Sequence, residues 1–256
     1  MDVLPRHQQR CVELSVDSIL CRWSFICDPY KNDPFDRSHR LLLFTRMPLT
    51  STIRNANALS GLLLVLFLVV HLGGLTSALG APASFEAYAS GLHHNPLLKP
   101  LELGLALTSL LHISLSIHKG LRNRQAGNTA QLNSRRSEPF AAWASRSKAI
   151  AGVITLGFIG LHLQQLRFPR PMDGHEREAL VHVLHQPLSL AVYGLGALAI
   201  GLHLVHGTEA AHRSLGWLDP ANKSAIRFGG RLLAALLSGG FLLISLGLGL
   251  ALGAQA

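Results

Sequence analysis

Five long runs of apolar residues alternate with shorter polar segments along this chain. The runs cover residues 57–79, 100–117, 149–166, 187–207 and 232–253. Each is close to the roughly 20 residues that a helix needs to cross the hydrocarbon core of a bilayer. The pattern therefore predicts an all-α integral membrane protein with five transmembrane helices.

The composition agrees with this interpretation. The 256 residues are 48% hydrophobic and only 14% charged, although the formal net charge is +9. Soluble domains are typically about 25% charged, and they do not collect their apolar residues into five blocks. A soluble globular domain is therefore excluded. We expect the lipid bilayer to surround the chain. We expect no nucleic acid among its partners.

Basic residues are divided unevenly between the polar segments. Those on one side of the predicted helices are Lys119, Arg122, Arg124, Arg135, Arg136, Arg146, Lys148, Arg213, Lys223, Arg227 and Arg231, and those on the other are Lys99, Arg167, Arg170 and Arg177. Cytoplasmic loops of membrane proteins carry an excess of Lys and Arg. The richer side should therefore be cytoplasmic, which places the N-terminus inside and the C-terminus outside.

Four of the apolar runs contain a histidine well inside the span: His71, His112, His162 and His203. Each lies roughly 12–16 residues beyond the entrance of its run, about 18–24 Å into a core about 30 Å thick. Because successive helices run in opposite directions, the first and third histidines should share the outer half of the membrane. The second and fourth should share the inner half. Both hairpins separate their histidines by 41 residues.

A histidine in hydrocarbon needs partners for its ring nitrogens, and intramembrane ionisable residues are usually functional. Two pairs matched in depth predict that the first four helices form a bundle holding two haem b groups, each between two axial histidines. The alternative for each histidine is a hydrogen bond between helices. Glycines near the histidines could make room for flat porphyrins, although small residues also favour ordinary helix packing: Gly152, Gly157, Gly160, Gly194, Gly196 and Gly201.

Other polar residues are weaker candidates. Possible contacts to haem propionates or a quinone headgroup near the inner face are His118, Lys119, Arg122 and His206. We expect no iron ligand among the outer-loop histidines His93, His94, His175, His182 and His185. Glu86 and Glu102 are the carboxylates nearest the outer histidine pair and could serve a quinone. A solvated loop residue is the simpler role for Glu86, and a charge at a helix entrance suits Glu102.

The four histidine segments are SGLLLVLFLVVHLGGL, LELGLALTSLLHISLSIHKGLR, GVITLGFIGLHL and YGLGALAIGLHLVHG. In order and spacing, across residues 50–253, they resemble the single-chain, five-helix, two-haem cytochrome b anchor of succinate dehydrogenases and fumarate reductases. The resemblance implies His112 and His203 on a proximal haem and His71 and His162 on a distal one. It also implies a location in the cytoplasmic membrane of a prokaryote.

The same resemblance implies partners and a role. Flavoprotein and iron–sulfur subunits would dock on the cytoplasmic face, and electrons from succinate would pass through the two haems to a membrane quinone. The chain itself would have no catalytic residue, because the bond-making steps belong to the partner subunits. We therefore expect an electron-transfer and anchor subunit of an oxidoreductase.

The first 46 residues do not fit this pattern. They hold Cys11, Cys21 and Cys27 without the closely spaced ligand pairs of a zinc site. We expect residues 1–46 to be a disordered or peripheral extension, or a mis-assigned start with Met47 as the true first residue. Residues 47–256 would form the transmembrane domain. No disulfide is expected on the cytoplasmic side.

Two other functions fit the same pattern. One is a two-haem cytochrome b that serves a different quinone-linked donor, such as a hydrogenase, a formate dehydrogenase or an ascorbate-type reductase. The other is a haem-free transporter or structural bundle, which would be colourless. Against the transporter, the first four runs contain no obvious break near the midplane.

Overall fold

The computed structural model describes residues 34–125 and 139–250. The chain divides into two compact units, Met1–Pro48 and Leu49–Ala256. The described part of the first unit is helical and continues into the first helix of the second. The predicted extension, residues 1–46, lies mostly outside the described residues. The rest of this section concerns the second unit.

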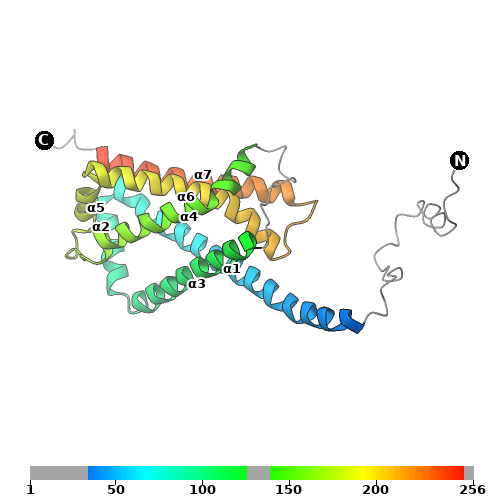
Figure 1. Ribbon diagram of the computed structural model, residues 1–256. Coiled ribbons are helices and arrows are strands. Elements are labelled where there is room, and N and C mark those ends of the chain that lie inside the picture. Colours follow the sequence, from blue (N-terminus) through cyan, green and yellow to red (C-terminus); the bar gives the residue numbers. More distant parts are fainter. Residues whose placement is uncertain (1–33, 126–138, 251–256) are drawn as a thin grey trace. The chain divides into compact units, whose positions relative to one another are not determined.

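Helices make up every regular element of the described residues (Figure 1). In chain order they are α1 (Pro34–Gly80), α2 (Pro82–His94), α3 (Leu98–Gln125), α4 (Pro139–His162), the π-helical turn η3 (Leu163–Arg167), α5 (Glu176–Leu184), α6 (Pro187–Ser214) and α7 (Lys223–Leu250). The all-α class predicted from the hydrophobic pattern is confirmed.

Five of these helical segments are long and apolar enough to cross a membrane. They are Ser51–Gly80, Leu98–Asn123, Arg146–Arg167, Pro187–Ser214 and Lys223–Leu250. The five predicted spans are therefore present, and they indicate an integral membrane protein. Most extend beyond the apolar runs because polar residues continue the helix. The predicted end of the fifth run, residues 251–253, lies outside the described residues.

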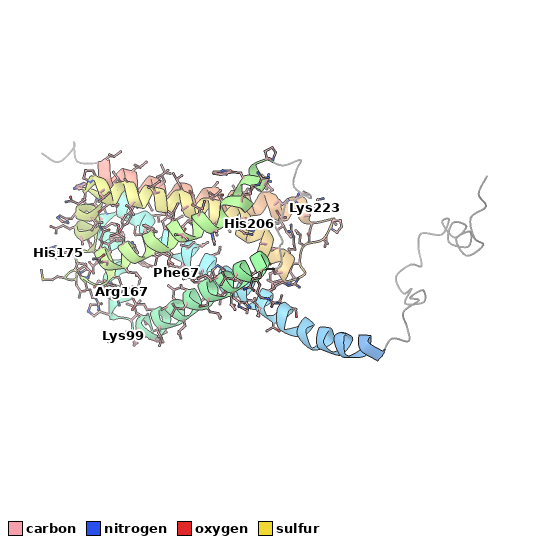
Figure 2. The ribbon with its side chains drawn as sticks, in the orientation of Figure 1. Phe67, Lys99, Arg167, His175, His206 and Lys223 are labelled. Carbon is pink, nitrogen blue, oxygen red and sulfur yellow. The ribbon has the colours of Figure 1, made fainter. Side chains whose placement is uncertain are left out.

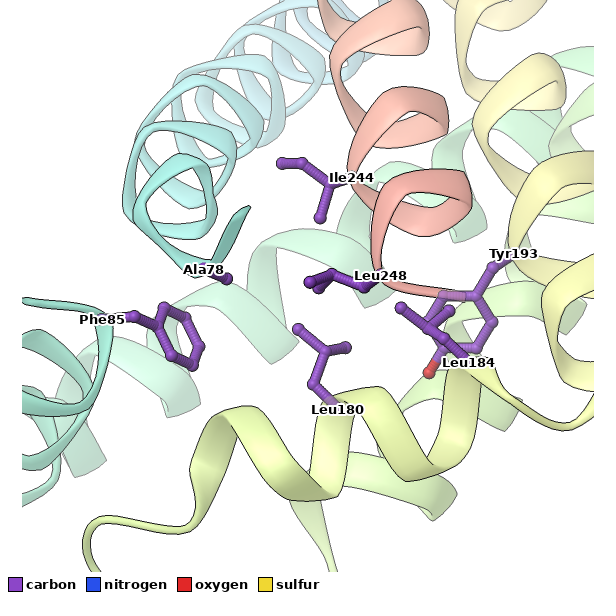
Figure 3. Close-up of a cluster of buried hydrophobic side chains, with 7 residues drawn as sticks. All are labelled: Ala78, Phe85, Leu180, Leu184, Tyr193, Ile244 and Leu248. Atoms are coloured by element: carbon purple, nitrogen blue, oxygen red, sulfur yellow. The ribbon is translucent and has the colours of Figure 1, made fainter. Parts of the chain in front are cut away.

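Two helices occupy connections that we expected to be loops. Helix α2 follows α1 and begins with Pro82, which suits the first position of a helix because its missing N–H would have no helical partner. The nine-residue α5 precedes α6. Both contribute to a buried cluster (Figure 3) formed by Ala78, Phe85, Leu180, Leu184, Tyr193, Ile244 and Leu248. Packing against three long helices therefore stabilises these short ones.

Helix α7 runs alongside α6 (Figure 1). A second buried cluster joins them through Ile200, Leu204, Ala234 and Leu237. The close approach depends on Gly201, where a Cβ would lie 2.7 Å from the Cβ of Ser238. The described part of α7 carries no histidine, and the helix packs beside the histidine-bearing ones.

Figure 2 shows Lys99, Arg167 and His175 towards one end of the second unit and His206 and Lys223 towards the other. This separation follows from the alternating direction of the long helices. It places the basic residues predicted to be outside and those predicted to be inside at opposite ends. Which end faces the cytoplasm stays a prediction.

Candidate functional site

The structure brings the four intramembrane histidines together in two pairs. The ring centroids of His71 on α1 and His162 on α4 are 6.0 Å apart, with an interplanar angle of 78°. Those of His112 on α3 and His203 on α6 are 6.3 Å apart, with an angle of 77°. These are the partners that follow from depth and helix direction. Ligation of iron stays a prediction.

The separation within each pair can be compared with that across a shared metal ion. Two metal–imidazole bonds of about 2.0 Å, plus roughly 1.1 Å from each ligating nitrogen to its ring centre, put the centroids about 6.2 Å apart. The observed 6.0 and 6.3 Å agree with this value. A direct hydrogen bond between the rings would need them closer. Each pair is therefore spaced as two axial ligands would be.

A glycine on the neighbouring helix faces each ring of the inner pair. A Cβ at Gly61 on α1 would lie 3.0 Å from Cε1 of His112, and one at Gly152 on α4 would lie 3.5 Å from Cε1 of His203. Each glycine precedes the outer-pair histidine of its own helix by ten residues. At 1.5 Å per residue, the two histidine levels are therefore about 15 Å apart along the helices.

The other glycines singled out from the sequence divide into two groups. A Cβ at Gly157 or Gly160 would meet nothing within 4 Å. At Gly196 it would lie 2.5 Å from Cγ of Phe158, and at Gly194 it would lie 3.7 Å from Leu242. Together with Gly201 at the α6–α7 contact, these last residues permit helix packing. Of the six glycines named, Gly152 is the one that faces a histidine of the pairs.

His112 is held by hydrogen bonds from α1. Its Nδ1 lies 3.2 Å from the carbonyl oxygen of Asn57 and 3.2 Å from Oγ of Ser60. A carbonyl can only accept, so Nδ1 donates the proton and Nε2 keeps its lone pair. Metal-ligating histidines typically donate their second ring N–H to a carbonyl or carboxylate in this way. The expected alternative, a hydrogen bond between helices, is thus present at one nitrogen while the other stays available as a ligand.

Aromatic residues surround the outer pair. The His71 ring stacks on Phe67 at 5.3 Å and lies 6.0 Å from the ring of Phe241. Nδ1 of His162 lies 3.3 Å from the hydroxyl of the buried Tyr193, and Phe158 is 5.7 Å from the same imidazole. Apart from this hydroxyl, these ring contacts are apolar, and they favour neutral imidazoles.

The predicted propionate or quinone contacts lie near the inner end of their helices. His118 and Arg122 are exposed, whereas Lys119 and His206 are half-buried. Lys119 lies within electrostatic range of Lys148 and Arg54, so α1, α3 and α4 each contribute to a basic cluster. Contact of any of these residues with a propionate or a quinone stays a prediction.

A buried carboxylate, Glu209, was missed from the sequence. Its side chain is 5% exposed, and it accepts hydrogen bonds from Arg213 at 2.5 Å and Arg227 at 3.2 Å. The spacing of four residues between Glu209 and Arg213 is a sequence signal for a helical ion pair. The contact between Glu209 on α6 and Arg227 on α7 has no such signal in the sequence.

At the outer end, Glu102 does more than occupy a helix entrance. Both its carboxylate oxygens accept from Arg167, at 2.6 Å each. Arg167 ends the π-helical turn that follows His162, a feature with no signal in the sequence. Arg167 lines an open pocket of about 380 Å³, together with His93, His94, Lys99 and Arg170.

The expectation that Glu86 is a solvated loop residue is wrong. It is half-buried on α2 and accepts the backbone N–H groups of Glu176 at 3.1 Å and Arg177 at 2.9 Å, which caps α5. Burial, together with a hydrogen bond to the Glu176 carboxylate, raises the pKa of Glu86. Burial opposes ionisation of Glu176 as well, but hydrogen bonds from Glu86 and from backbone N–H groups hold its pKa below the usual value. The Glu86 carboxyl is therefore the weaker acid of the two.

Comparison with known proteins adds no relative. No protein-family model, no curated protein and no solved structure matches this chain.

Proposed function

We propose that this chain is a two-haem cytochrome b subunit that anchors a succinate:quinone oxidoreductase in the membrane and carries electrons between its iron–sulfur subunit and a quinone. The observation that supports this most directly is the pair of imidazole separations, 6.0 and 6.3 Å, at two levels of the same helices. The order and spacing of the four histidine segments supports the particular complex.

The residues present fit two haem groups, each of which would be held by two imidazoles. His71 and His162 would hold one, and His112 and His203 the other. Haem iron bound there would supply one-electron transfer without an open site for oxygen or substrate. Gly61 and Gly152 leave space beside the inner imidazoles, where a Cβ would stand in contact with the rings.

Residues that contact the imidazoles would orient them and shield them from water. The backbone carbonyl of Asn57 fixes the tautomer of His112 by accepting a hydrogen bond from its Nδ1. Tyr193 orients His162 through its hydroxyl. Phe67, Phe158 and Phe241 keep water from the outer imidazoles, and such burial tunes the potential of a metal centre.

The charge distribution supports the proposed orientation. The basic cluster of Lys119, Lys148 and Arg54 lies at the end that the positive-inside rule assigns to the cytoplasm. The flavoprotein and iron–sulfur subunits would dock at this end. The quinone would then react at either membrane interface, within reach of one haem level.

The first test is a count of haem in the purified full-length chain. The expected result is two b haems per polypeptide by pyridine haemochrome, both low-spin in the dithionite-reduced spectrum. A folded, colourless preparation would remove the electron-transfer proposal and return the four histidines to structural roles. A spectrum of haem iron with an open coordination position would be equally incompatible with ligation by two histidines.

Histidine variants test the two proposed haem sites one at a time. Replacing either His112 or His203 with Gln should remove one haem, and replacing both should remove no more than one, because the pair acts as a unit. His71→Gln and His162→Gln should remove the other haem. His182→Gln is the control, since His182 is exposed on the short helix α5, outside the membrane spans and outside both pairs. Loss of both haems from every histidine variant, the control included, would mean general destabilisation.

A separate experiment tests the donor. The affinity-tagged chain should co-purify with a flavoprotein and an iron–sulfur protein from the membrane of its own cell, and succinate should then reduce its haems. If haem is present but a hydrogenase or formate dehydrogenase co-purifies, the cytochrome stands and the donor is different.

A further inference from the structure

We infer that the outer end of the protein carries a site for a divalent transition-metal ion, zinc foremost, formed by His93, Asp173 and Glu176. His93 lies at the end of α2, Asp173 in the connection after η3, and Glu176 at the first position of α5. One ligand atom from each residue lies within 4.8 Å of the other two. The site is separate from the intramembrane histidine pairs.

Two buried atoms point into this cluster without a hydrogen bond. They are Nδ1 of His93 and Oε1 of Glu176, and neither has a hydrogen-bond partner or contact with solvent. The Glu176 side chain is only 7% exposed. An unsatisfied buried polar atom costs about 1–3 kcal/mol, and more when it carries charge. A cation between the two atoms would satisfy both.

The distance between these atoms matches a shared metal ion. They are 3.2 Å apart but not in hydrogen-bond geometry. Two ligands on a tetrahedral zinc ion, each bonded at about 2.0 Å, lie about 3.3 Å from one another. One imidazole nitrogen and two carboxylate oxygens are ligands that zinc accepts, with water in the fourth position.

The other side of the cluster supplies the third ligand and a path for the ion. Asp173 is 52% exposed and already reaches α2, where its Oδ2 lies 3.3 Å from Nε2 of His94. A short rotation of this exposed carboxylate towards His93 would complete the set. Because Asp173 faces water, an ion can enter from that side, which a usable metal site requires.

A second set of contacts orients the buried ligands. The backbone N–H of Gly174 donates to Oε2 of Glu176 at 2.8 Å, which leaves Oε1 to face His93. Gly174 has φ +85°, a conformation that suits glycine and turns the chain between Asp173 and Glu176. Arg170 donates to the backbone carbonyl of His93 at 3.4 Å. The contact from Gly174 to Glu176 is of the kind that holds a metal-ligating carboxylate in position.

The charges favour a cation. Two carboxylates meet here, from Asp173 and Glu176, and the guanidinium of Arg177 donates to the backbone carbonyl of Ala78 at 2.8 Å. A bound divalent ion would balance this negative charge and tie α2 to α5. It would act as a structural clamp over the outer histidine pair.

The test measures zinc on the detergent-purified full-length chain after chelator treatment and dialysis. Added zinc sulfate should bind at one equivalent per chain, by elemental analysis after gel filtration and by competition with a fluorescent zinc chelator. Zinc is counted separately from iron, so the result does not depend on whether the chain holds haem.

Asp173→Asn is the decisive variant, because the side chain is exposed and its loss should leave the fold intact, as checked by elution volume and helical circular dichroism. It should weaken zinc binding by at least tenfold, and His93→Gln should do the same. The control is the double variant His175→Gln, Glu178→Gln, which removes an exposed His–carboxylate contact of 2.8 Å nearby. Absence of stoichiometric zinc, or equal affinity in the Asp173 variant and the control, would overturn the inference.

Discussion

The space beside His112 gives a graded test of the proposed inner haem site. Three single variants each replace one glycine with alanine, at Gly61, Gly152 or Gly73. A Cβ would lie 3.0 Å from Cε1 of His112 in the first, 3.5 Å from Cε1 of His203 in the second, and beyond 4 Å from any atom in the third. The three variants therefore add the same methyl group at decreasing proximity to an imidazole.

The expected magnitudes follow from these distances. Carbon atoms pack best at about 3.5–4.0 Å, so the His112 ring must move by about 0.5 Å or more in Gly61→Ala. Overpacking of this kind costs about 1–3 kcal/mol. Alanine also favours a helix over glycine by about 1 kcal/mol, a gain that all three variants share. Gly61→Ala should thus be about 1–3 kcal/mol worse than Gly73→Ala, which is roughly 5- to 150-fold in haem affinity.

The assay is haem retained per chain during a dilution or competition series, with the reduced spectrum and unfolding temperature recorded for each variant. Gly61→Ala should release one haem first, whereas Gly152→Ala and Gly73→Ala should behave alike. Equal haem affinity in all three variants would refute the argument that Gly61 makes room beside an axial ligand. Equal losses at Gly61 and Gly73 would refute it as well, because Gly73 faces open space.

Three further predictions concern the ends of the helices. Glu209→Ala should destabilise the protein by about 2–4 kcal/mol, measured as thermal unfolding in detergent, because it removes a buried carboxylate that pairs with Arg213 and with the half-buried Arg227. Arg167→Lys should cost about 0.5–1.5 kcal/mol in the same assay, since lysine cannot make both hydrogen bonds to Glu102; an unchanged melting temperature would contradict the bidentate contact. The hydrogen bond to Glu178 raises the pKa of His175 above 6.5. The stabilisation from this contact should be fully present below pH 6.5 and lost as pH rises through the folded pKa, so His175→Gln should lower the melting temperature at low pH and leave it unchanged at high pH.

Long continuous apolar runs were sufficient to predict the five membrane spans, because a helix in lipid must satisfy its own backbone and show an apolar surface along its whole length. The partners of the four histidines followed from depth and alternating direction alone. Helices α2 and α5 could not be predicted in this way. They are short and mixed in composition, and their stability comes from contacts of Phe85, Leu180 and Leu184 with helices distant in the sequence.

The roles of Glu86 and Glu176 were missed for a related reason. Each looks like an ordinary acidic residue in a polar segment, and only the packing of α2 on α5 buries them together. The π-helical turn after His162 had no signal either, although it directs Arg167 towards Glu102. Polar contacts between short connecting helices depend on tertiary structure that no local pattern records.

Gly61 is different, because a signal for it was present in the sequence. His162 follows His71 by 91 residues, His203 follows His112 by 91, and Gly152 follows Gly61 by 91. The glycines thus belong to the same repeat as the histidines, and in the structure each faces the imidazole of the other level. If the histidines served only to make hydrogen bonds between helices, each would need a donor or acceptor at its own level. That role would not require a glycine ten residues before His71 and another ten residues before His162. The repeat spaces imidazoles at both levels and keeps a side chain away from the inner rings, and both features agree with the proposal of two haems at two levels of the same helices.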